Sequence, residues 1–99
     1  MNKTFILAGF LLTSVTGIAS ADSPQEERRE RAAERIENAF DRDPVLRRYD
    51  LDADSEGDRT GYIELEGRVK NRGHLNRALS IARQIAPSYR IVNRIRVGR

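Results

Sequence analysis

The chain has 99 residues, of which 33% are charged and 38% hydrophobic, and its formal net charge is +3. It contains no cysteine, which excludes disulfide bonds, thiolate metal sites and a lipid attached through an N-terminal cysteine. A chain of this length predicts one small domain with a modest core.

The first 21 residues have the pattern of a secretory signal peptide. Lys3 precedes an apolar run from Phe5 to Val15, and the small residues Ala19-Ser20-Ala21 come just before Asp22. The apolar run is shorter than the roughly 20 residues that a helix needs to cross a bilayer. We therefore expect export, cleavage after Ala21, and a single domain formed by residues 22–99.

Charge is distributed unevenly along the expected mature chain. Residues 22–66 contain fifteen acidic and eight basic side chains, whereas residues 67–99 contain nine basic side chains and no acidic one. A basic half of a chain indicates nucleic acid or an anionic surface as partner. Because the export signal argues against nucleic acid, we expect lipid head groups.

A first amphipathic helix is predicted to begin at Ser23-Pro24-Gln25-Glu26. This segment combines a capping serine, a proline at the first helical position and a glutamate three residues after the cap. Apolar residues then recur at helical spacing as far as Phe40, and charged residues cover the other sides. The Asp43-Pro44 step should end the helix, because proline disfavours helical geometry in the residue before it.

The rest of the chain predicts three strands and a second helix. Residues 49–54 and 63–69 each alternate between apolar and charged positions, which is typical of strands with one buried face, and the polar segment 55–61 between them predicts a hairpin loop. Apolar residues from Leu75 to Ala86 indicate a helix that Pro87 ends, and residues 91–97 alternate again. The prediction is an α+β domain, in the order helix, strand, strand, helix, strand, with both helices on one face of a three-stranded sheet.

Two of these segments, GYIELEGRV at 61–69 and IVNRIRV at 91–97, resemble the BON domain family, which is named for bacterial osmotic-shock and nodulation proteins. The resemblance covers a core of about residues 28–97. It implies a non-enzymatic module of the bacterial envelope that attaches to phospholipid membranes, and hence a periplasmic protein in envelope maintenance or in osmotic or envelope stress. Two departures from the family pattern are Pro87-Ser88, where members usually have Gly-Val, and a longer and more acidic first hairpin loop.

Three positions of this motif, Gly61, Gly67 and Asn93, are expected to be structural. Gly61 can take a positive φ as the loop enters the strand, and Gly67 can let a helix approach the sheet closely. Asn93 lies on the same face of its strand as the apolar residues and should point inward. We therefore expect it to satisfy backbone groups at the end of the sheet.

A group of basic residues runs from the end of the second strand into the second helix, with no acidic residue nearby in sequence. We predict that these residues face an anionic phospholipid surface, because each basic side chain near such a surface contributes ~1 kcal/mol. They are Arg68, Lys70, Arg72, Arg77 and Arg83. An alternative is a protein-interaction or structural module that engages another envelope protein through its charge dipole.

The acidic first loop is a second candidate site, for calcium or another cation. Asp52, Asp54, Glu56 and Asp58 alternate around Gly57, as oxygen ligands and a turn glycine do in calcium loops. The match is incomplete, because position twelve is Ile63 where such loops have a bidentate glutamate. The alternative is a solvated strand face followed by a polar turn.

Two further groups of polar residues have simpler interpretations. Arg90, Arg94 and Arg96 share one face of the last strand and are expected to pair with acids on the neighbouring strand. His74 is the only histidine and has no recognisable nucleophile or acid partner in sequence. We therefore expect neither catalysis nor a cofactor.

Overall fold

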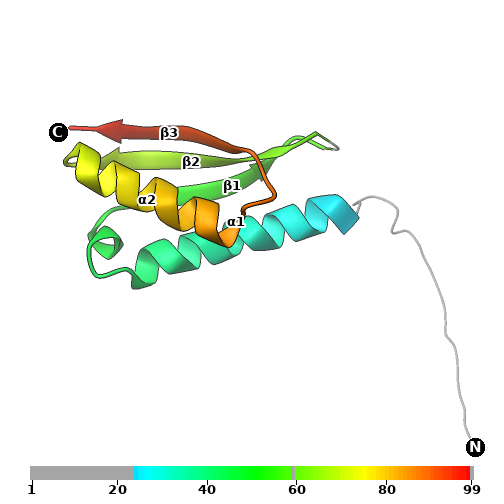
Figure 1. The fold of residues 1–99 in the computed structure, drawn as a ribbon, viewed down its shortest axis with the longest axis horizontal. Coiled ribbons are helices and arrows are strands. Elements are labelled where there is room, and N and C mark those ends of the chain that lie inside the picture. Colours follow the sequence, from blue (N-terminus) through cyan, green and yellow to red (C-terminus); the bar gives the residue numbers. More distant parts are fainter. Residues whose placement is uncertain (1–23, 59, 99) are drawn as a thin grey trace, which may run out of the picture.

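The computed structural model describes residues 24–58 and 60–98, so the predicted signal peptide, 1–21, lies outside the described residues. Figure 1 shows the order of the elements along the chain. They are α1 (Pro24–Arg42), the 3₁₀ helix η3 (Leu46–Arg48), β1 (Asp52–Glu56), β2 (Tyr62–Val69), α2 (Arg72–Ile85) and β3 (Ile91–Val97). The order of helices and strands and the α+β class agree with the sequence-based prediction.

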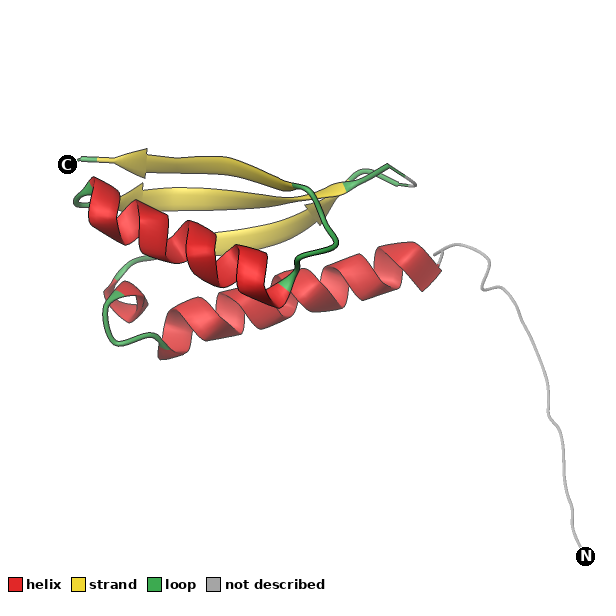
Figure 2. Cartoon of the chain, viewed as in Figure 1, coloured by secondary structure: helices red, strands yellow, loops and turns green. Residues whose placement is uncertain are grey.

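The three strands form a mixed sheet in the order β1-β2-β3. β1 is antiparallel to β2 through a hairpin, and β3 is parallel to β2 after the α2 crossover. Figure 2 shows both helices beneath one face of this sheet. Within the residues that the structure describes, no element covers the other face, which we call the open face.

The core lies between the helices and the sheet. α1 contributes a narrow buried stripe that includes Ile36 and Phe40, and the sheet contributes Ile63, Leu65 and Val69. α2 buries mainly alanine and leucine. Small residues on α2 let this helix lie close to the sheet, and the two helices also contact each other.

The ends of the helices follow local rules. α1 ends at Arg42, one residue before Asp43, whose Oδ2 accepts the backbone N–H groups of Val45 and Leu46, both at 3.0 Å. Asn71 caps α2 by accepting the N–H of His74 at 2.9 Å. The proline-based end points predicted for both helices therefore agree with the structure.

The first strand begins later than the alternation of residues 49–54 predicted. The chain from Leu46 to Arg48 first makes a 3₁₀ turn, and the N–H of Tyr49 donates to the carbonyl oxygen of Leu46 at 2.9 Å. β1 therefore starts at Asp52, although Leu51 already packs in the core. The alternation of apolar and charged residues did not reveal the 3₁₀ turn. Tyr49 continues this alternation in sequence, although it lies outside β1.

The two glycines of the motif have backbone environments that differ from the predicted ones. Gly67, and not Gly61, has a positive φ, of 139°. A Cβ at Gly67 would lie 2.8 Å from the carbonyl oxygen of Asp50, so the segment that approaches closely is the entry to β1 and not a helix. Asn93 is exposed although it lies on the face of β3 that was expected to point inward, and its Oδ1 accepts the backbone N–H of Ile95 at 2.9 Å, so it satisfies a backbone group as expected.

Candidate functional site

The open face carries a gradient of charge across the three strands. The strand register places outward side chains side by side, so that Glu66 lies between Asp52 and Arg94, and Arg68 lies beside Arg96. β1 contributes only acidic residues to this face, and β3 contributes arginines and one valine. The outward residues are Asp52, Asp54 and Glu56 on β1, Tyr62, Glu64, Glu66 and Arg68 on β2, and Arg90 (just before β3), Val92, Arg94 and Arg96.

Two of the three arginines along β3 have partners on β2. Arg94 forms a salt bridge with Glu64, and the guanidinium of Arg90 lies 5.7 Å from the centre of the Tyr62 ring. The pairing of Arg94 is of the kind expected from the sequence. Such exposed pairs contribute ~0.2–1 kcal/mol each, so they shape the surface more than they stabilise the fold.

The five basic residues of the predicted lipid surface do not share one face. Arg68 points from the open face of β2, whereas Arg77 and Arg83 belong to α2 on the opposite face of the sheet. Arg83 also lies eleven residues along α2 from Arg72, a rise of ~16 Å. Lys70 lies in the turn between β2 and α2, and Arg72 is the first residue of α2.

Arg77 is engaged within the fold. Its Nε donates to Oδ2 of Asp43 and its Nη2 donates to Oδ1, both at 2.8 Å. The guanidinium lowers the pKa of the Asp43 carboxyl to about 2, and the carboxylate in turn raises the pKa of Arg77. This ion pair joins the end of α1 to α2, and we therefore remove Arg77 from the candidate surface.

Four exposed basic residues do gather at one end of the domain, where β2 and β3 end and α2 begins (Figure 1). We call this set the basic end; it consists of Arg68, Lys70, Arg72 and Arg96. Arg96 was not in the predicted set, because only the parallel register brings it beside Arg68. The first turn of α2 contains no acidic residue, so the positive end of the helix dipole adds to the same charge.

The turn that contains Lys70 and leads into Arg72 is held by hydrogen bonds. The hydroxyl of Tyr49 accepts the backbone N–H of Lys70 at 3.2 Å and lies 2.6 Å from Nδ1 of His74. The N–H of Gly98 donates to the carbonyl oxygen of Val69 at 2.8 Å, which ties the end of β3 to the same turn. His74 therefore has a structural partner in Tyr49.

The acidic residues of the predicted cation loop do not converge. Asp52, Asp54 and Glu56 follow one another along the open face of β1, where alternate residues are ~7 Å apart. Among residues 24–58 and 60–98, no three histidine, cysteine, aspartate or glutamate side chains form a group that could hold a metal ion. Burial and the charges of Asp50, Asp54 and Asp41 instead raise the pKa of Asp52.

The residue that organises this loop is Arg29, which was not among the sequence-based candidates. It is buried on α1, and its Nε donates to Oγ of Ser55 at 2.7 Å. Its Nη1 and Nη2 donate to the carbonyl oxygens of Asp58 and Gly57, at 2.9 and 2.8 Å. The sequence did contain a signal, because Arg29 precedes Ala32 and Ala33 at helical spacing and so falls on the apolar stripe.

Neither α1 nor α2, nor any other helix of the described residues, is long and apolar enough to cross a membrane. Comparisons of the chain with models of known protein families, with curated proteins and with solved structures found no match. The resemblance to the BON family therefore stays a prediction from the residues of β2 and β3.

Proposed function

We propose that the protein is an exported, non-enzymatic binding module that docks on anionic phospholipid at the periplasmic membrane surface. The docking surface is the basic end. The observation that carries this proposal is the gathering of Arg68, Lys70, Arg72 and Arg96 around the start of α2. The BON resemblance independently suggests the same class of partner.

The arrangement of the basic end is unfavourable for an isolated domain. Lys70 and Arg72 lie at the positive end of the α2 dipole, where anions are favoured and cations are not. An anionic surface offsets this unfavourable interaction with the helix dipole, which accounts for basic residues at these two positions.

The expected affinity is modest. Basic residues near an anionic leaflet contribute ~1 kcal/mol each, so the four residues give weak docking. Since the Debye length shrinks to ~3 Å at 1 M salt, the interaction should be lost at high ionic strength. The proposal therefore predicts reversible association with the membrane and no insertion into it.

The test is co-sedimentation of the purified protein with anionic and with neutral vesicles across a salt series. The variant Lys70→Glu with Arg72→Glu should lose binding and keep its fold, since acidic residues suit the start of a helix. Arg28→Glu with Arg35→Glu makes the same change in net charge on α1 and should bind nearly as well as the parent. Equal loss in both variants would show that only net charge matters, and absence of binding to anionic vesicles would overturn the proposal.

The alternative from the sequence, binding to an envelope protein, is favoured by the charge gradient on the open face. An acidic β1 at one edge of the sheet and a basic β3 at the other can distinguish between the two orientations of a charged partner. This alternative predicts recovery of a stoichiometric protein partner from envelope extracts together with no affinity for bare lipid.

A further inference from the structure

The sheet has two edges, and the backbone hydrogen bonds show which groups face outward at the β3 edge. The carbonyl oxygen of Arg90 accepts the N–H of Ile63 at 2.9 Å, and the N–H of Gly98 donates to Val69 at 2.8 Å. In a parallel ladder, successive residues of a strand alternate in the direction of their backbone groups. Ile91, Asn93, Ile95 and Val97 therefore direct N–H and C=O groups away from β2, toward the edge.

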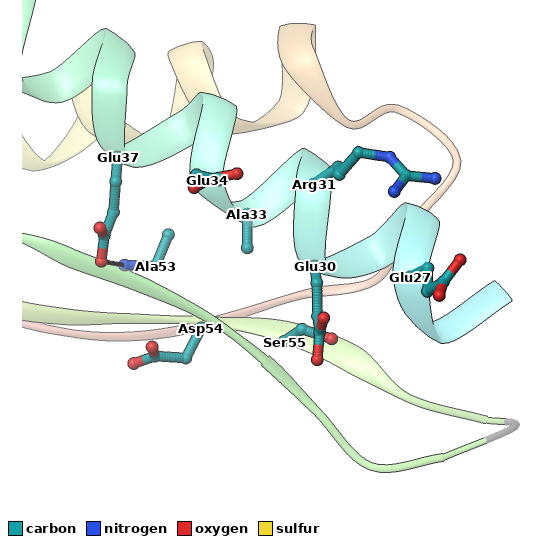
Figure 3. A pocket seen from close by; sticks show the side chains of 9 residues that line it. All are labelled: Glu27, Glu30, Arg31, Ala33, Glu34, Glu37, Ala53, Asp54 and Ser55. Carbon is teal, nitrogen blue, oxygen red and sulfur yellow. Dashed lines mark hydrogen bonds between the residues drawn. The ribbon is translucent and has the colours of Figure 1, made fainter. Parts of the chain in front are cut away.

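At each edge, one outward N–H is held by a side chain in place of a strand. On β3, Oδ1 of Asn93 accepts the N–H of Ile95 at 2.9 Å. On β1, Oε2 of Glu37 reaches from α1 to accept the N–H of Ala53 at 3.0 Å (Figure 3). Both contacts use side chains that a change of rotamer can withdraw, so both edges can accept another strand.

The edge of β1 borders an acidic groove. Figure 3 shows the side chains of α1 that flank this groove above the strand. Five of the nine lining residues are acidic and one is basic; the acidic ones are Glu27, Glu30, Glu34, Glu37 and Asp54. The groove lies on the helix side of the sheet and therefore favours an occupant with positive charge on that side.

The β3 edge offers positive charge on both sides of the sheet. On the open face it carries Arg94 and Arg96, with Arg90 just before it, and these match the acidic open face of β1. On the helix side, where the groove lies, exposed Arg83 belongs to α2, the helix that contacts β3. Val97, which is 41% exposed, also lies on this edge strand, and an added strand would cover it.

We propose that a second copy of this chain occupies the β1 edge, with β3 of one copy pairing against β1 of the next. β1 is antiparallel to β2 and β3 is parallel to β2, so the new pair is antiparallel when the sheet continues in one orientation. The acidic open face of β1 then lies beside the arginines of β3. The contact joins two different surfaces and generates head-to-tail assemblies. Glu37 and Asn93 must first leave their edge amides, which keeps the association weak.

The test is sedimentation velocity of the purified protein over a range of concentration and salt. The parent should associate with rising concentration, less so at high salt. Arg90→Glu with Arg96→Glu reverses the β3 edge, and Asp54→Lys with Glu56→Lys reverses the β1 edge; each double variant alone should stay monomeric. An equimolar mixture of the two double variants should associate again. The unaltered β1 edge of one variant and the unaltered β3 edge of the other have opposite charges, and so do the two reversed edges. Arg94 is left unchanged to keep its salt bridge with Glu64.

Two further variants make the test decisive. Arg47→Glu with Arg48→Glu changes the net charge equally on η3, away from both edges, and should associate like the parent. Asn93→Ala frees the Ile95 amide and should strengthen association. A parent and an Asn93→Ala variant that both stay monomeric would overturn the proposal, as would a mixture of reversed variants that does not associate. Arg96 also belongs to the basic end, but this experiment contains no vesicles, and Lys70→Glu with Arg72→Glu leaves both sheet edges unchanged, so failure of one proposal can be distinguished from failure of the other.

Discussion

The guanidinium of Arg29 occupies the space that a side chain at position 61 would need. A Cβ added to Gly61 would collide with Cζ and Nη1 of Arg29 and with the carbonyl oxygen of Glu56. The glycine is thus required by a buried arginine and not by a positive φ. The side chain of Arg29 joins α1 to β1 and to the β1–β2 loop.

Replacing Arg29 should therefore destabilise the domain and release the loop. Arg29→Met removes three hydrogen bonds from a charged donor, and we expect the free energy of unfolding to fall by about 3 kcal/mol. Urea denaturation measures this change. Gly61→Ala should also destabilise the parent, and the double variant should lose less than the sum of the two single changes. Strictly additive losses would show that the two positions are not coupled.

The fold was predictable because the apolar residues of its core recur at the regular spacing of helices and strands. The stripes of α1 and α2 and the alternation of β2 and β3 identify which faces are buried, and Pro44 and Pro87 follow the ends of the two helices closely. The 3₁₀ turn was not predictable in this way, because three residues are too few to show a period.

The candidate site was predictable only in part. Lys70 and Arg72 are neighbours in sequence, so their proximity needs no fold. The position of Arg96 beside Arg68 depends on the parallel register, and the capture of Arg77 by Asp43 joins residues 34 positions apart. Charge runs in sequence identify basic residues but not the face on which each one lies.

The Asp43–Arg77 ion pair should make stability depend on pH in the acid range. The folded pKa of Asp43 is lowered from 3.8 to about 2, so its stabilising effect is fully present above the unfolded value and is lost as pH falls through the folded value. Arg77→Gln should lower the melting temperature near neutral pH, and its difference from the parent should vanish toward pH ~2. Arg83→Gln, on the same helix, serves as the control with little effect at any pH. A difference that persists at the lowest pH would contradict this role.

Asp52 should have the opposite effect on the pH dependence of stability. Burial, followed by the charges of Asp50, Asp54 and Asp41, raises its pKa, so the folded state takes up a proton more readily than the unfolded state. Ionised Asp52 destabilises the fold, and this effect is relieved as pH falls through the raised value. Asp52→Asn should increase the melting temperature near neutral pH and make no difference in acid. A decrease in the melting temperature near neutral pH would mean that the carboxylate has a stabilising partner.

Tyr49 connects stability to the geometry of the basic end. Its hydroxyl holds the N–H of Lys70 and contacts His74, so Tyr49→Phe removes both hydrogen bonds while the ring can still pack. We expect a loss of about 1–2 kcal/mol, since each such hydrogen bond contributes ~0.5–1.5 kcal/mol. Hydrogen exchange at the Lys70 amide should accelerate more than exchange at the core amide of Leu65, because the opening is local. Tyr49→Phe should also weaken vesicle binding, since Lys70 and Arg72 are then less well placed. Unchanged hydrogen exchange at the Lys70 amide would show that the turn does not depend on Tyr49.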